Sequence, residues 1–248
     1  MTLWRLEWVR LTRTGRILIL LAVFFSMGII GPLTVRYLPE LLDSAGGGQE
    51  VIVQLPPVSP EFAMASFLSN AIQLGLLAIA FVGAAALAID AKPEISVFFR
   101  SRATIRQILF PRFVMTAGAA VVAFTVGVIT AVVVSGVLID WPDAASTIVA
   151  SSLVALYLVF AVAVIALFGS LVRRVPATAL LTIGSLIVLS VVGVYEPIAA
   201  WMPSYLVGGF DGIIGGGDFV YWRSIAATVA LIAGALWLTV VRLENREV

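Results

Sequence analysis

The sequence predicts an all-α membrane protein with six transmembrane helices in a single domain, residues 1–248. Hydrophobic residues make up 61% of the chain and charged residues 12%, and the mean hydropathy is +1.12. A soluble domain of this length could not bury that much apolar surface. Six intervals also lack any charged residue, and each holds the roughly 20 apolar residues that a helix needs to cross a bilayer. We place the spans in them, at residues 17–35, 67–89, 113–139, 147–172, 177–195 and 224–241.

The first span begins like a signal peptide, with basic residues followed by an apolar run. No small-x-small cleavage site precedes a polar segment, because the run continues into "GPLTVRYLPELL". We therefore interpret this run as a transmembrane helix. An even number of spans places both termini on one side of the membrane.

The distribution of basic residues predicts which side that is. With both termini inside, thirteen of the fifteen Lys and Arg residues fall on inner segments, and only Arg36 and Arg223 fall outside. Inner segments of membrane proteins carry such an excess of Lys and Arg. The sequence therefore predicts a multi-pass protein with cytoplasmic N- and C-termini.

Residues 1–16 precede the first span and predict an interfacial helix. Trp4, Trp8 and Leu11 recur at the spacing of one helical face, while the arginines project elsewhere. Such a helix would lie on the inner membrane surface with its tryptophans at headgroup depth. The alternative is an ordinary basic flank that only sets topology.

Two long segments are expected on the outer side, residues 36–66 and 196–222. The first contains "SAGGGQ" and "PPVSP", which predict a turn-rich loop or short hairpin. The second interleaves aromatic residues with glycine and proline, which favours short re-entrant helices that dip into the outer interface between spans five and six, or an aromatic belt.

Polar and small residues mark the second span as a packing helix. Asn70 and Gln73 stand three positions apart on one face, where amides commonly hydrogen-bond a neighbouring helix, and a place on a transport pathway is the alternative. Further along, Ala80, Ala84 and Ala88 form a small-xxx-small stripe that lets another helix approach closely.

The residues needed for common catalytic sites are missing from the sequence. The chain has no cysteine and no histidine, and every Asp and Glu falls outside the apolar runs. The sequence contains no nucleotide-binding motif, zinc motif or protease motif. We therefore expect no catalytic residue, no metal site and no cofactor in this chain. Carriers coupled to ion movement commonly use carboxylates within their spans, so we expect an external source of energy.

The inner segment between spans two and three, residues 90–112, predicts ordered structure. Pro93 and Glu94 suit the first turn of a short helix. Phe98 and Phe99 then lie on its apolar face. A second helix starts at the T-x-x-Q capping box of Thr104 and Gln107, and leads into span three through a kink at Pro111. Its apolar face would hold Ile105, Ile108 and Leu109.

This segment resembles the coupling region of type-2 ABC transporter permeases, the membrane subunits of ABC exporters. Their loose pattern has an acid, a hydrophobic patch, an arginine, a hydrophobic pair and a final basic residue. These positions are matched here by Glu94, Phe98 with Phe99, Arg106, Ile108 with Leu109, and Arg112. Two departures are Ile95-Ser96 in place of Ser-Gly, and Arg102 where proline is usual. "GPLTVRYLPELL" and the inner segment also resemble an actinobacterial group of these permeases.

The resemblance implies that this chain works in the bacterial cytoplasmic membrane together with separate subunits. Two cytoplasmic ABC ATPase subunits would bind ATP and Mg, and a second permease copy or a paralogue would complete the pathway near spans two and five. We expect membrane lipid, and no nucleic acid, among the other partners. The candidates for receiving motion from the ATPases are Glu94, Phe98, Phe99, Arg100, Arg102 and Arg106.

Two other functions remain open from the residues. A membrane scaffold or sensor subunit could use the basic segment to bind anionic lipid or a signalling partner, at about 1 kcal/mol for each Lys or Arg. An intramembrane enzyme would have to use Asp90, Glu94 or Glu196. For an exporter, the apolar spans favour a hydrophobic or amphiphilic substrate.

Overall fold

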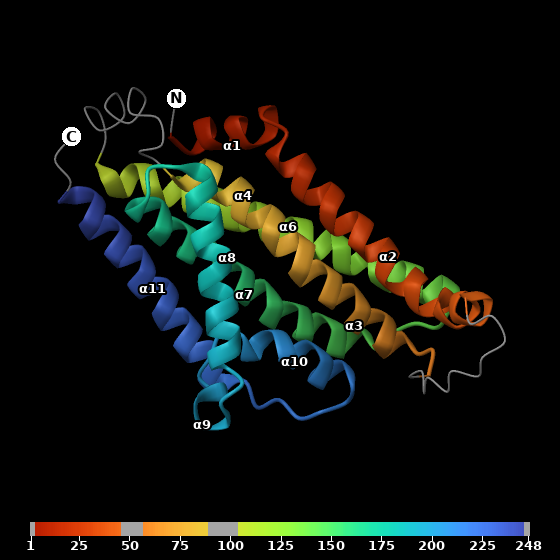
Figure 1. Ribbon diagram of the computed structural model, residues 1–248. Coiled ribbons are helices and arrows are strands. Elements are labelled where there is room, and N and C mark those ends of the chain that lie inside the picture. Colours follow the sequence, from red (N-terminus) through yellow and green to blue (C-terminus); the bar gives the residue numbers. More distant parts are fainter. Residues whose placement is uncertain (1–2, 46–56, 89–103, 246–248) are drawn as a thin grey trace.

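The described part of the chain is a bundle of long helices, seen in a computed structural model that describes residues 3–45, 57–88 and 104–245 (Figure 1). These residues form no β-strand. Six helical stretches are long and apolar enough to cross a membrane: Arg16–Glu40, Pro60–Leu87, Ile105–Leu138, Ala144–Leu171, Val175–Val192 and Trp222–Glu244. The predicted all-α architecture with six candidate spans is therefore confirmed.

The chain begins with a short helix set at an angle to the first long one. Helix α1 spans Leu3–Arg13, and α2 spans Arg16–Ala45 (Figure 1). Gly15 adopts φ +68° between them, a left-handed conformation that glycine reaches without steric cost. Helix α2 continues past Arg36, where we expected the outer loop to begin. An ion pair between Arg36 and Glu40, one turn apart, supports this extension.

The second span consists of three helical pieces and begins earlier than predicted. Helix α3 (Pro60–Asn70), the π-helix η1 (Ala71–Gly75) and α4 (Leu76–Leu87) follow one another without a break. Pro60 sits in the first turn, and the Ser59 hydroxyl accepts a hydrogen bond from the Phe62 amide at 3.2 Å. Both features are typical helix starts, which explains why the helix begins at residue 60.

The third span is the longest helix. Helix α6 covers Ile105–Leu138 and continues through Pro111. It begins outside the predicted span because the inner segment's second helix and span three form one element. Helix α7 (Ala144–Leu171) returns after a short connection that ends with an Asp143 cap, and α8 (Val175–Val192) follows.

Two short helices separate the last two spans. Helix α9 covers Glu196–Ala199 and α10 covers Tyr205–Ile214, before α11 (Trp222–Glu244) runs back toward the N-terminal end of the bundle (Figure 1). Helix α10 buries Leu206, Phe210 and Ile213 and packs against α7 and α3. The expected short helices between spans five and six are therefore present.

Helix α7 forms the centre of the bundle. In its most apolar stretch 61% of the residues are buried, against 22% in α8 and in α11, so those two helices lie on the periphery. A second packed region joins α2, α3 and α6, where Phe124 contacts the rings of Phe24 and Phe67 at centroid distances of 5.9 and 6.0 Å. The small residues Ala80, Ala84 and Ala88 are buried in and after α4, which packs against α7 and α8.

Candidate functional site

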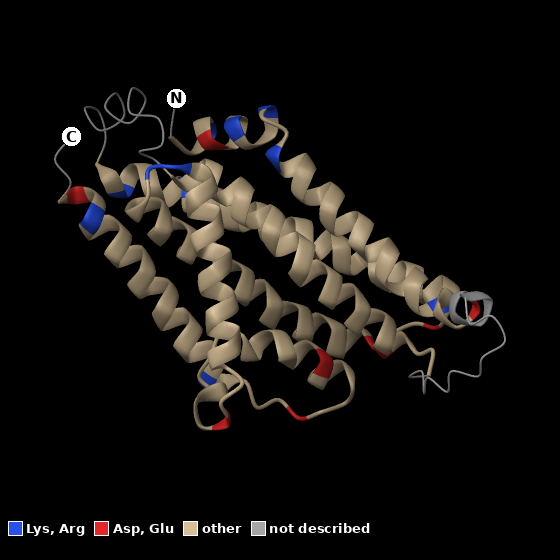
Figure 2. Cartoon of the chain, in the orientation of Figure 1, with Lys and Arg blue, Asp and Glu red and all other residues tan. Residues whose placement is uncertain are grey.

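Charged residues divide the bundle into two ends (Figure 2). We call one the basic end. It comprises α1, the first turns of α2 and α6, the connection between α7 and α8, and the last turn of α11. The opposite end carries α9, α10 and most of the described Asp and Glu residues, together with Arg36 and Arg223. The charge separation that the sequence indicates is therefore also a separation in space.

The predicted coupling residues divide into two groups. Glu94, Phe98, Phe99, Arg100 and Arg102 lie outside the described residues. Arg106 is described, on the first turn of α6 at the basic end. Its side chain is 72% exposed, and its Nε lies 3.3 Å from Glu244 Oε1 at the end of α11. The arginine thus links the start of span three to the end of span six.

The capping box at the start of α6 is formed as predicted. The Gln107 amide donates to Thr104 Oγ1 at 3.4 Å, and the Thr104 amide donates to Gln107 Oε1 at 3.1 Å. This reciprocal pair satisfies two backbone donors that the helix start would leave unpaired. Ile105, Ile108 and Leu109 are buried, so the apolar face assigned to this helix is also confirmed.

A buried ion pair joins α1 to α6. The Arg112 Nε donates to Glu7 Oε1 at 2.9 Å, and both side chains are at most 9% exposed. The two residues are 105 positions apart in the sequence. A buried charge is tolerated when a partner of opposite sign neutralises it, and removing one member of such a pair is costly. The pair therefore fixes α1 against the first turns of span three.

Arg10 extends this contact to the end of the second span. Its Nη1 lies 3.6 Å from Glu7 Oε1, and its Nη2 donates to the Ala85 carbonyl at 3.4 Å. Ala85 lies in the last turn of α4, where backbone carbonyls lack helical partners and favour cations. Helix α1 therefore contacts both helices that flank the inner segment, α4 before it and α6 after it.

The three residues that we placed on one face of α1 differ in burial. Trp4 and Trp8 are 41% and 53% exposed, whereas Leu11 is buried together with Glu7. The buried side of α1 is the one from which Glu7 reaches Arg112, and Trp4 and Trp8 stay largely exposed. Sequence reasoning missed Glu7. The available signal was that it is the single acidic residue before Glu40, placed one turn from Leu11.

Asn70 and Gln73 lie near the middle of the second span. The Asn70 Nδ2 donates to the Ser66 carbonyl at 3.0 Å, so this hydrogen bond is within its own helix. Gln73 belongs to η1 and is exposed on the bundle surface. In the same π-helix, Gly75 faces the Phe24 ring so closely that a Cβ would lie 2.5 Å from Phe24 Cζ. Such π-helical turns occur frequently at functional sites.

The opposite end is built from aromatic residues and glycine. The Tyr221 ring packs on Tyr205 and Phe219, with centroids 5.3 and 5.8 Å apart. A Cβ on Gly209 would lie 2.8 Å from the Tyr221 ring. The Ser224 hydroxyl donates to the Met202 carbonyl at 2.6 Å, which ties α11 to the loop before α10.

Within the described ranges, no group of three His, Cys, Asp or Glu side chains is placed to hold a metal ion. Comparison with protein-family models, with curated proteins and with solved structures finds no match to this chain. The chemistry of the site therefore rests on its own geometry. That geometry offers a fixed charged contact at the flanks of the inner segment.

Proposed function

We propose that this chain is the membrane-spanning permease subunit of an ATP-driven exporter of the type-2 ABC class. It would move a hydrophobic or amphiphilic substrate out across the bacterial cytoplasmic membrane. Two separate ATPase subunits would bind ATP and Mg and dock on the inner segment. The basic end would then be cytoplasmic, in keeping with the excess of Lys and Arg on inner segments.

The observation that carries this proposal is the attachment of α1 to both flanks of the inner segment. Arg10 contacts the end of α4, and Glu7 holds Arg112 of α6. Because α1 contacts both flanks of the inner segment, a displacement of that segment could move spans two and three together. A loop that only set topology would need no such buried contact.

The exposed amide of Gln73 supports a second permease copy or paralogue. It lies near the midpoint of the 28-residue span Pro60–Leu87. Moving an amide from water into an alkane costs on the order of 4–8 kcal/mol when it finds no hydrogen bond. We therefore place this face of span two against a partner subunit or the substrate pathway rather than against lipid.

The position of α10 supports a role for this helix as the outer gate of the proposed exporter. It is apolar, packs against α7 and α3, and lies at the opposite end from α1. In the proposed orientation it would be a re-entrant helix at the outer surface. Motion of span four, which is formed by α7, would reach it directly.

The test is to purify the chain together with any ABC ATPase that is encoded beside it, in wild-type form and with Phe98→Asp and Phe99→Asp. We expect the double variant to lose co-purifying ATPase and substrate-stimulated ATP hydrolysis, because charge would replace an apolar docking surface. Val220→Asp is the matched control, since it places the same charge on an exposed site at the opposite end.

Undiminished assembly and ATPase stimulation in the Phe98 and Phe99 variant would overturn the docking assignment. If no ATPase is retained by the wild-type protein, the scaffold or sensor function takes precedence. Mass spectrometry of the purified complex would report the ATPase, the permease partner and any retained substrate in one measurement.

A further inference from the structure

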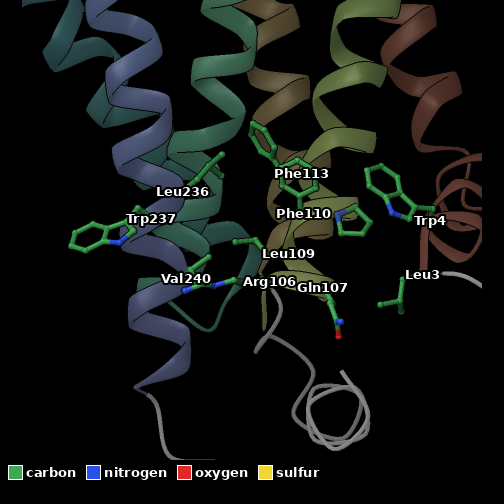
Figure 3. A pocket seen from close by; sticks show the side chains of 11 residues that line it. Leu3, Trp4, Arg106, Gln107, Leu109, Phe110, Phe113, Leu236, Trp237 and Val240 are labelled. Carbon is green, nitrogen blue, oxygen red and sulfur yellow. The ribbon is translucent and has the colours of Figure 1, made fainter. Parts of the chain in front are cut away.

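A groove opens on the bundle surface at the basic end, between α1, the first turns of α6 and the last turns of α11 (Figure 3). Its volume is about 990 Å³, which is at the upper end of the range for small-molecule sites. The described residues that line it come from α1, α6 and α11. We ask what occupies it separately from the proposed transport function.

The walls of the groove are apolar and aromatic. Phe110 meets Trp4 edge-on, with ring centroids 6.1 Å apart and planes at 79°. Leu236 and Val240 line the other side from α11, together with Trp237 (Figure 3). Phe110 and Trp237 are 57% and 64% exposed, so large rings stand unburied along the groove. These α6 and α11 residues belong to helices that are long and apolar enough to span a membrane.

The mouth of the groove is charged. Among the described lining residues, Arg106 is the charged side chain, and it lies next to Gln107. Its pairing with Glu244 uses Nε, and a guanidinium has five N–H donors in total. Further arginines lie on α1 and in the last turn of α11, two of the helices that line the groove (Figure 2). The mouth is thus complementary to an anion, and the walls to hydrocarbon.

We propose that this groove is a binding site for one anionic phospholipid of the same leaflet. The acyl chains would lie along Phe110, Phe113 and Leu236, and the phosphate would accept hydrogen bonds from Arg106. Tryptophans such as Trp4 and Trp237 favour the headgroup region, which places the groove at the depth where a phosphate meets its acyl chains. Basic clusters beside membrane spans attract anionic lipid.

A phospholipid fits this groove better than a soluble peptide or a second copy of the chain. The α6 and α11 walls belong to apolar spans, so an occupant must be stable in hydrocarbon as well as at the surface. A second copy packed symmetrically on this face would bring one cationic end against another. The site does not depend on an ATPase, and its test is separate from the test of the transport function.

Native mass spectrometry of the purified full chain tests the proposal. The protein is equilibrated in mixed micelles with equal amounts of phosphatidylglycerol and phosphatidylcholine that carry identical acyl chains. We expect one phosphatidylglycerol to be retained per chain in preference to phosphatidylcholine. Arg106→Ala should lower that preference about fivefold, the equivalent of about 1 kcal/mol for one cation. Glu244→Gln should raise it, because the competing carboxylate is removed.

Two further variants distinguish lipid binding in the groove from general electrostatic attraction of anionic lipid to the basic end. Val240→Trp fills the groove without changing charge, and should abolish retention of either lipid. Arg242→Ala removes a neighbouring cation that does not line the groove, and should leave the preference nearly unchanged.

Three results would overturn the proposal. Equal losses from Arg106→Ala and Arg242→Ala would mean that the basic end attracts anionic lipid only as a whole. Unchanged lipid retention in the Val240→Trp variant would place the lipid elsewhere. A change of oligomeric state in that variant, without loss of lipid, would assign the groove to a second copy.

Discussion

The two ends of the bundle are held together by different physical means. At the basic end, α1 is attached through a buried ion pair and an arginine bonded to a helix carbonyl. At the opposite end, α10 and α11 are attached through packed aromatic rings, close glycine contacts and one hydroxyl bond. A charge-assisted hydrogen bond has a defined geometry, which would suit the transmission of position that we propose for α1. Apolar contacts are less directional, which would suit the outer opening that we propose for α10.

The largest effect is expected from breaking the charged attachment. Glu7→Ala should lower the free energy of unfolding by about 3–5 kcal/mol, because the buried Arg112 guanidinium loses the carboxylate that accepts its Nε hydrogen bond. Unfolding by sodium dodecyl sulfate in mixed micelles measures this change. The double replacement Glu7→Met with Arg112→Met should recover much of the loss, since it removes both charges.

The control for this experiment is an ion pair at the opposite end. Glu40→Ala breaks the contact with Arg36, whose two side chains are 45% and 65% exposed. Exposed pairs of this kind contribute at most about 1 kcal/mol. Losses of similar size in Glu7→Ala and Glu40→Ala would show that the buried pair does not hold α1 as described.

A smaller loss is expected from overpacking the opposite end. Gly209→Ala would place a methyl group 2.8 Å from the Tyr221 ring and 3.0 Å from Leu153 Cδ1. Overpacking of this kind lowers the free energy of unfolding by about 1–3 kcal/mol. Unfolding by sodium dodecyl sulfate in mixed micelles measures this loss. Gly208→Ala is the matched control, because a Cβ at that position would meet no atom within 4 Å. Equal free energies of unfolding for Gly209→Ala and Gly208→Ala would refute close packing at this end.

A local effect is expected at the start of α6. Thr104→Ala removes half of the capping box and should cost about 1 kcal/mol, so amides in the first turn should exchange with solvent about fivefold faster. Hydrogen exchange with peptide-level mass spectrometry measures this. Thr125→Ala, which removes a hydroxyl bond to Val121 in the middle of the same helix, should leave that turn unchanged. Equal rates in Thr104→Ala and the wild type would contradict the cap.

The smallest expected effect is a pH dependence at the start of α7. Hydrogen bonds from the Ser146 hydroxyl and amide hold the pKa of Asp143 below its usual value of about 3.9. The cap therefore contributes fully above that value, and its contribution is lost as the pH falls through the lower folded pKa. Carboxyl carbon NMR shifts would report this pKa. Ser146→Ala should move it upward, and an unshifted pKa in the wild type would contradict the hydrogen bonds.

Sequence patterns were sufficient for the spans and for the start of α6. Long uncharged runs predict the six helices because a bilayer leaves every backbone amide to be satisfied within its own segment. Thr104 and Gln107 predict a helix start because a cap is local, formed by residues three apart. The prediction was wrong at residues 36–45, which we expected in the outer loop. The turn signal "SAGGGQ" begins only at Ser44, and α2 continues to Ala45.

Only the tertiary structure decided which residues form the candidate site. Glu7 and Arg112 are separated by more than a hundred residues, and nothing in the sequence pairs them. The exposed position of Gln73 depends on how η1 and Gly75 pack against Phe24, and the groove depends on three helices from distant parts of the chain. Hydrophobicity and capping act within a few residues, so the sequence shows them directly. Ion pairing and cavity shape depend on how distant helices pack, so they become visible only in the assembled bundle.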